Sequence, residues 1–168
     1  MKRWVVLATA AISIGVLIQA TGAGSTDPPT VLKAGTMAGV IGPYVGTANP
    51  IRGVNGGGLP WQIDEAKVVL LADGRLTAKV EGLVLLDGPP VPEALQGTNP
   101  ITSFRAIVSC QTVDGTAATV TNRITDAFPA SPAGNSKIEA TVDLPSPCFA
   151  PIVFVTSPGG AWFAVTGR

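Results

Sequence analysis

"AKVVLLADGRLTAKVEGLVLL", residues 66–86, consists of two apolar runs that meet at Asp73 and Gly74. Asp-Gly between such runs is a strong signal for a β-hairpin, because the tight turn needs positive φ. A two-residue turn at this point pairs Leu71 with Leu76, Val69 with Ala78 and Lys67 with Val80. Those pairs then lie on one, mainly apolar face, and the other face is more mixed, with Val68 opposite Lys79 and Leu70 opposite Thr77.

Further strands are predicted downstream of this hairpin. A second Asp-Gly pair, Asp114-Gly115, separates "FRAIVSCQTV" from "TAATVTNRI". Alternation puts one set of side chains on a common inward face: Phe104, Ala106, Val108 and Cys110. "KIEATVDL", residues 137–144, alternates most clearly. The runs "PIVFVTS" and "AWFAVTG" around Pro158-Gly159-Gly160 are almost wholly apolar, as in strands covered on both faces.

The spacing of these elements predicts an all-β fold with about seven or eight strands. We expect an antiparallel β-sandwich, Greek-key or immunoglobulin-like, or a small barrel. Residues 61–168 form the predicted sandwich core. Residues 24–60 read as a flexible lead-in and loops with a possible edge strand, and 24–168 as a single domain. "VPEALQG", residues 91–97, predicts one helical turn.

The N-terminus has the pattern of a secretory signal peptide, assigned to residues 1–23. Lys2 and Arg3 precede the uncharged run "WVVLATAAISIGVLI", and small residues follow. Cleavage after Ala23 fits best, and cleavage after Ala20 is the second choice. An uncleaved membrane anchor is the alternative, but the apolar run is shorter than the ~20 residues that a spanning helix needs. We therefore expect a secreted or cell-envelope protein with no membrane span after cleavage.

Charge excludes some classes of partner. The chain has 11 basic and 11 acidic residues, and loss of Lys2 and Arg3 with the leader leaves the mature protein slightly acidic. Such a balance gives no basis for binding nucleic acid or an anionic membrane surface.

The two cysteines lie in apolar stretches, Cys110 in "FRAIVSC" and Cys148 in "PSPCFAPIVF". An even cysteine count in an exported chain indicates pairing. The bridge joins the Asp114 hairpin to the C-terminal hairpin across about 38 residues, a loop for which chain entropy predicts ~4 kcal/mol. The alternative is two buried thiols that pack as small hydrophobic groups.

Residue types also limit the chemistry. The chain has no histidine, which removes Ser-His-Asp and Cys-His catalysis and the usual zinc sites. Asp64 and Glu65 are adjacent, so a strand would point them to opposite faces. A glycosidase needs two carboxylates across a cleft, and no such pair can be assigned from the sequence. We expect no catalytic residue, no metal site and no cofactor.

Four residues are candidates for binding: Trp61, Tyr44, Asn55 and Asp64. Trp61 ends the glycine-rich stretch "NGGGLPW" and lies near Asn55 and Asp64, so its ring could stack on a sugar face. The alternative is that Trp61 closes one end of the core, which is where large aromatic side chains usually lie. We expect the core placement.

Three stretches carry a resemblance: "GLPWQIDEAKVVLLADGRL", "GTNPITSFRAIVSCQT" and "LPSPCFAPIVFVTSPGGAWFAVTG". They resemble a set of small secreted bacterial proteins of unknown function. The resemblance implies export and a single domain, and it implies no active site.

These observations predict a secreted, non-catalytic binding or structural module of the cell envelope or extracellular space. The expected partner is a cell-envelope component or a glycan. The alternative is a carboxylate-dependent hydrolase that acts on a glycan. A pocket with two converging carboxylates would favour the enzyme, and a flat surface with exposed aromatic residues would favour the module.

Overall fold

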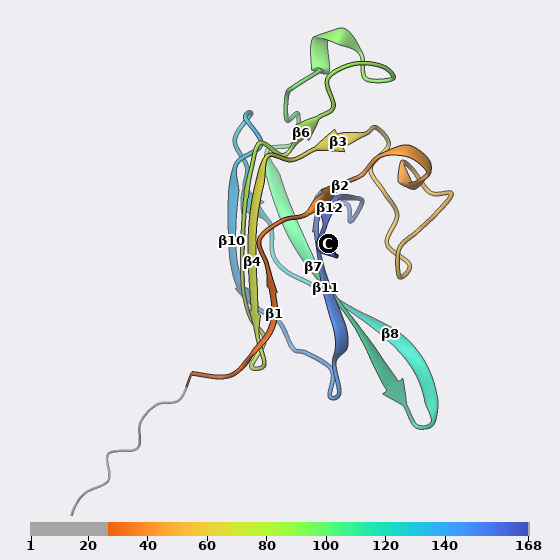
Figure 1. Ribbon diagram of the computed structural model, residues 1–168, viewed down its shortest axis with the longest axis vertical. Helices are drawn as coiled ribbons and strands as arrows, with labels where there is room; N and C mark the ends of the chain where they lie inside the picture. Colours follow the sequence, from red (N-terminus) through yellow and green to blue (C-terminus); the bar gives the residue numbers. More distant parts are fainter. Residues whose placement is uncertain (1–26, 168) are drawn as a thin grey trace, which may run out of the picture.

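The computed structural model describes residues 27–167, so the predicted leader lies outside the described residues. The chain forms a sandwich of two antiparallel sheets (Figure 1). The four-stranded sheet has the order β1-β4-β5-β10. Its strands are β1 (Thr30–Ala34), β4 (Glu65–Leu71), β5 (Arg75–Glu81) and β10 (Ser136–Thr141).

The six-stranded sheet has the order β2-β12-β11-β7-β8, and β9 pairs with β7 beside this path. Its strands are β2 (Ala38–Gly39), β7 (Ser103–Asp114), β8 (Ala117–Ile124), β9 (Phe128–Pro129), β11 (Phe149–Thr156) and β12 (Trp162–Val165). A short pair, β3 (Trp61–Gln62) with β6 (Val84–Leu85), lies at one end of the sandwich. The all-β antiparallel sandwich predicted from the sequence is therefore confirmed.

Two short 3-10 turns, η1 (Gly42–Tyr44) and η2 (Glu93–Leu95), lie in the loops. The second falls where one helical turn was predicted. Between residues 27 and 167, no helix has the length and apolar character that crossing a membrane requires.

The core lies between the facing surfaces of the two sheets, where every second side chain of a strand points inward. The four-stranded sheet contributes Val68, Leu70, Leu76, Ala78, Val80 and Ile138. The six-stranded sheet contributes Phe104, Ala106, Val108, Cys110, Val153 and Val155. The inward face predicted for Phe104 to Cys110 is confirmed, since all four side chains are fully buried.

The register of the β4–β5 hairpin differs from the prediction by one residue. Leu70, not Leu71, lies opposite Leu76, and Val68 lies opposite Ala78. The loop has three residues, with Gly74 at φ +85° and its N–H donating to the carbonyl of Leu71 at 3.0 Å. A three-residue loop with glycine in the left-handed region is a common alternative to the two-residue turn.

This difference has a simple consequence for β4. The inward face predicted for β5 is correct, but the one predicted for β4 is wrong, because a slip of one residue moves every side chain of a strand to the other face. Val68 and Leu70 are fully buried, whereas Lys67 lies on the exposed outer face.

Residues 27–60 supply one edge strand to each sheet. β1 pairs with β4, and β2 pairs with β12. The loop after β2 brings Tyr44 against Trp162, and all four residues of β12 are buried, as the sequence predicted for a strand covered on both faces. Residues 55–57 also pair with the edge of β12 through backbone hydrogen bonds, Gly57 N–H to the carbonyl of Trp162 at 2.8 Å and Trp162 N–H to the carbonyl of Asn55 at 2.9 Å.

The predicted disulfide is present. Cys110 of β7 is bonded to Cys148, which immediately precedes β11. The bridge therefore ties together two adjacent strands, since Phe149 pairs with Gln111.

Candidate functional site

Trp61 is a core residue. Only 3% of its surface is exposed. Its ring stacks on Phe163 with centroids 3.9 Å apart and meets Phe104 edge-on at 6.4 Å. The ring is thus enclosed by its neighbours and presents no face on which a sugar could stack.

The other three candidate residues are exposed but do not form one site. Asp64 lies against Gly82 at the start of the β4–β5 pair, because a Cβ built on Gly82 would meet its carboxylate. The ring of Tyr44 lies tilted against that of Trp162, with ring centroids 6.5 Å apart. Asn55 follows in the same loop and lines a hollow. Of the four, only Asn55 lines this candidate site.

This hollow, which we call the loop hollow, lies where the loop before β3 meets β8 and the β11–β12 turn. It has a volume of about 440 Å³. Its lining is Thr47, Gly53, Val54, Asn55, Gly56, Ile107, Asn122, Ile124, Gly159, Gly160 and Ala161. None of these residues is charged, and two amide side chains lie among apolar and glycine surfaces. The lining suits an uncharged ligand that has both polar and apolar surface.

One wall of the loop hollow is a tight hairpin at Ile51–Val54. Ile51 and Val54 exchange two backbone hydrogen bonds, of 2.9 and 3.0 Å. Arg52 and Gly53 have φ of +49° and +79°, which matches the positive φ that a type I′ turn requires at both central residues. Positive φ is unusual for arginine, so tertiary contacts must stabilise this turn.

Those contacts come from the Arg52 side chain. Its guanidinium donates to the carbonyl of Ser109 at 2.9 Å and to the carbonyl of Ala150 at 2.8 Å. The β7–β11 ladder is interrupted there, because the register shifts between Phe149 and Ile152. Arg52 therefore supplies donors where the ladder has a gap. Partial burial in this position lowers the pKa of the Arg52 guanidinium from its usual value.

Asn122 connects the floor of the loop hollow to the same hairpin. Its side chain lines the hollow, and its Nδ2 donates to the carbonyl of Arg52 at 3.0 Å. The hairpin is thus fixed to β7, β8 and β11 by three side-chain hydrogen bonds, and the site is formed before any ligand arrives.

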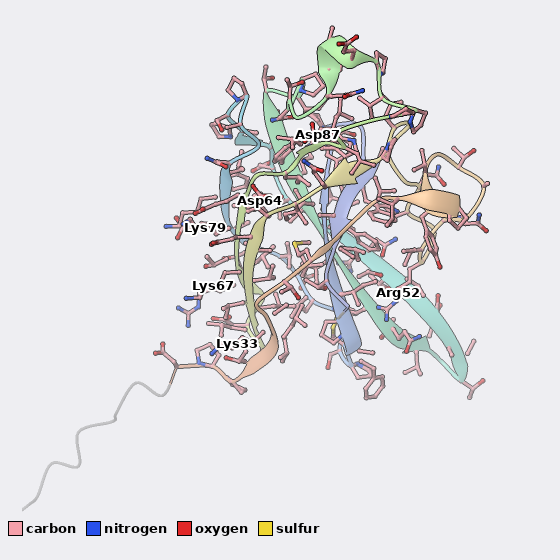
Figure 2. The ribbon with its side chains drawn as sticks, turned by 45° about the horizontal axis from the view of Figure 1, so that its top comes forward. Lys33, Arg52, Asp64, Lys67, Lys79 and Asp87 are labelled. Carbon is pink, nitrogen blue, oxygen red and sulfur yellow. A yellow bond between two sulfur atoms is a disulfide. The ribbon has the colours of Figure 1, made fainter. Side chains whose placement is uncertain are left out.

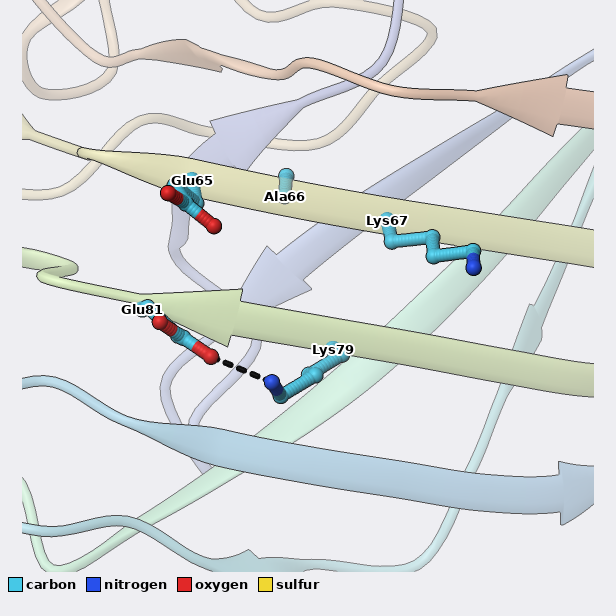
Figure 3. A pocket seen from close by; sticks show the side chains of 5 residues that line it. All are labelled: Glu65, Ala66, Lys67, Lys79 and Glu81. Atoms are coloured by element: carbon cyan, nitrogen blue, oxygen red, sulfur yellow. Dashed lines mark ion pairs between the residues drawn. The ribbon is translucent and has the colours of Figure 1, made fainter.

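A second hollow lies on the outer face of the four-stranded sheet, where Glu65 and Glu81 are paired across β4 and β5 (Figure 3). It is lined by Glu65, Ala66, Lys67, Lys79 and Glu81. Lys79 forms an ion pair with Glu81, whose hydrogen bond and charge raise the pKa of the lysine. Figure 2 shows this charged face on the opposite side of the molecule from Arg52.

The second hollow is small. Its volume is about 110 Å³, below the roughly 300–1,000 Å³ of most ligand pockets. Two carboxylates, those of Glu65 and Glu81, line this hollow, but they lie on an open sheet surface rather than on the two walls of a cleft.

Sequence reasoning missed Arg52, Asn122 and the Glu65–Glu81 pair. One signal was available: a residue followed by glycine, between Ile51 and Val54, fits a two-residue hairpin. The contacts of Asn122 and the pairing of Glu65 with Glu81 depend on strand register, and no pattern in the neighbouring sequence predicts them.

Within residues 27–167, no group of three or more His, Cys, Asp or Glu side chains is placed to hold a metal ion. A comparison with known proteins finds no matching family model, no matching curated protein and no matching solved structure. Function is therefore inferred from the geometry of the molecule.

Proposed function

We propose that this protein is an exported, non-catalytic binding module that holds an uncharged, hydroxyl-rich ligand, such as one unit of a glycan, in the loop hollow. The observation that carries the proposal is the preformed hollow of about 440 Å³ with an uncharged lining. Amide groups at Asn55 and Asn122 suit hydroxyl partners, and Ile124, which is 57% exposed, offers apolar surface to the ring of a sugar.

Export is supported by two independent features. The first residues have the order of a signal peptide. The Cys110–Cys148 disulfide is a bond that forms and persists in oxidising compartments such as the extracellular space. A cell-envelope or extracellular glycan is the partner that this location offers.

The test is a titration with a panel of neutral oligosaccharides, followed by amide chemical-shift changes. Binding should shift the amides of Gly53, Asn55 and Gly160. Asn55→Ala should weaken binding about fivefold, the effect of losing one hydrogen bond of ~1 kcal/mol. Ile124→Asp should abolish it by placing a charge against the ligand. Shifts confined to other surfaces, or affinity unchanged in both variants, would refute the proposal.

The alternative, a hydrolase that acts on a glycan, is favoured by one observation, the pairing of Glu65 with Glu81. Glu65→Gln and Glu81→Gln serve both as an assay for this alternative and as controls for binding. Binding in the loop hollow should be the same in both variants as in the wild type. Glycan hydrolysis by the wild type that disappears in both variants would favour the enzyme.

A further inference from the structure

The edges of the two sheets are treated differently. An exposed edge strand is a template for pairing with another chain, and proteins protect such edges by shortening them, charging them or bending them. β1 carries Lys33 and a register shift between Thr30 and Leu32. β10 carries Lys137 and Glu139, which form an ion pair of 2.7 Å. β2 has only two residues. The edges at β1, β10 and β2 are therefore protected.

The edge at β8 shows none of these devices. It has eight residues, with the sequence AATVTNRI, and it projects with β7 beyond the body of the sandwich (Figure 1). Its register with β7 is continuous from Ile124 to Ala117. Its one charged residue, Arg123, is turned to the carbonyl of Asp143, to which Nε donates at 2.7 Å.

The side chains of this edge are also open to solvent. Val120 is 41% and Ile124 57% exposed, and both lie on the outer face of the sheet. Exposed β-branched residues on a long edge with a single charge are the composition that favours strand pairing.

The free backbone groups of β8 can be assigned. Thr125 N–H donates to the carbonyl of Ala106 at 3.0 Å, so this pair is hydrogen-bonded. Hydrogen-bonded and non-bonded pairs alternate along an antiparallel ladder. The residues that direct their N–H and C=O to the free edge are therefore Ala118, Val120, Asn122 and Ile124.

We propose that β8 pairs antiparallel with β8 of a second copy of this chain, with Thr121 on the two-fold axis. In this register Val120 lies opposite Asn122 of the other copy, and Ala118 lies opposite Ile124, so every edge-directed backbone group finds a partner. Arg123 lies opposite Thr119, and no two like charges meet. A second copy is the occupant because the free N–H and C=O groups of the edge match those of a two-fold-related copy and no like charges face each other, as a two-fold interface requires.

The pairing joins the two six-stranded sheets into one continuous sheet. A two-fold axis normal to the sheet keeps both outer faces on the same side. If the proposed function holds, the two loop hollows then lie on one surface near the axis, because Asn122 and Ile124 line each of them. The dimer would bind a repeating glycan at two points, with the gain in avidity that linked sites give.

The test is the mass of the protein in solution, measured by sedimentation equilibrium from micromolar to millimolar concentration. The wild type should be a dimer at the upper end of this range. Val120→Pro removes an edge-directed N–H without breaking the β7–β8 ladder, and it should shift the protein to a monomer. Val120→Lys should do the same through a charge on the edge, in a salt-dependent way.

The matched control is Val113→Lys. Val113 is 48% exposed on the same outer face, but it belongs to β7 and not to the edge. This variant should remain dimeric if backbone pairing drives association, and it should dissociate if an apolar patch alone does. Amide exchange of the wild-type dimer should be slow at Val120, Asn122 and Ile124, and these amides should exchange quickly in the monomer.

A wild type that stays monomeric at millimolar concentration would overturn the proposal, and so would a dimer that survives both Val120 variants with circular dichroism unchanged. Dissociation by Val113→Lys would overturn the strand pairing as well. None of these outcomes tests whether a single loop hollow binds a glycan unit, because Val120 and Val113 lie outside the hollow. A wild type that forms the dimer but binds no glycan would refute the proposed function alone.

Discussion

Replacement of Trp61 by alanine tests whether this end of the sandwich is core rather than binding surface. Burial of a Trp side chain removes roughly 150–250 Å² of its surface from water. At ~25 cal/mol per Å², this stabilises the folded state by about 4–6 kcal/mol. Trp61 has close to its full share, since 3% of its surface is exposed. Measured Phe or Trp to Ala changes in cores cost about 3–5 kcal/mol.

The surroundings of the ring narrow this range. The stacked contact with Phe163 and the edge contact with Phe104 are lost together. The loop at Gly57 lies close above the ring, since a Cβ built there would be 3.3 Å from Trp61 Nε1. That loop can settle partly into the space left by the indole, which moderates the cavity cost. We therefore expect a loss of about 4 kcal/mol.

The assay is thermal and urea unfolding of the disulfide-intact protein. For a domain of this size, about 4 kcal/mol corresponds to a fall in Tm of roughly 8–16 °C. Tyr44→Ala is the matched control, because Tyr44 is an aromatic residue with 45% of its surface exposed. Its effect should be under about 1 kcal/mol. An unshifted midpoint for Trp61→Ala would refute the core assignment and return Trp61 to the candidate binding residues.

Three further predictions concern the leader, the disulfide and the two hydrogen bonds of the Arg52 guanidinium to the carbonyls of Ser109 and Ala150. Mass spectrometry of the secreted protein should find a new N-terminus at Gly24 or Thr21, and an intact, membrane-bound chain would contradict export. Thiol labelling of the denatured, unreduced protein should find no free cysteine. Cys148→Ala should lower the free energy of unfolding by ~4 kcal/mol, since the bridge closes a loop of 38 residues. An unchanged urea midpoint would argue against that contribution. Arg52→Ala should lower the free energy of unfolding by about 2 kcal/mol, because two charged hydrogen bonds are lost. Arg52→Lys should have an intermediate effect, because an ammonium group lacks the planar geometry of the guanidinium. Equal stability of both variants and the wild type would show that these hydrogen bonds do not stabilise the fold.

The parts of the fold that were predictable have a local period. Phe104, Ala106 and Val108 alternate with residues of β7 that face the other way, and a period of two is sufficient to assign a buried face. The glycines at the turns fixed where strands end. The pairing of Cys110 with Cys148 was predicted from the presence of two cysteines in a chain with an export signal, without any structural information.

The error in β4 shows where such reasoning stops. Val68, Val69, Leu70 and Leu71 are all apolar, so the run has no alternation from which to choose a face. The predicted inward face of β4 therefore depended on the length of the turn. Because the loop has three residues rather than two, the opposite face of β4 is buried. The same ambiguity hid the pairing of Glu65 with Glu81.

The sequence by itself determined the all-β class, most strand positions, the disulfide and the burial expected of Trp61, because these depend on alternation, turn residues and residue type within short stretches. Only the tertiary structure decided the loop hollow and the free edge of β8. Arg52 reaches carbonyls 57 and 98 residues away, and Asn122 reaches back 70 residues to Arg52. Contacts over such separations exist only where the loop at residues 51–54 lies against β7, β8 and the irregular start of β11, and no local pattern encodes them.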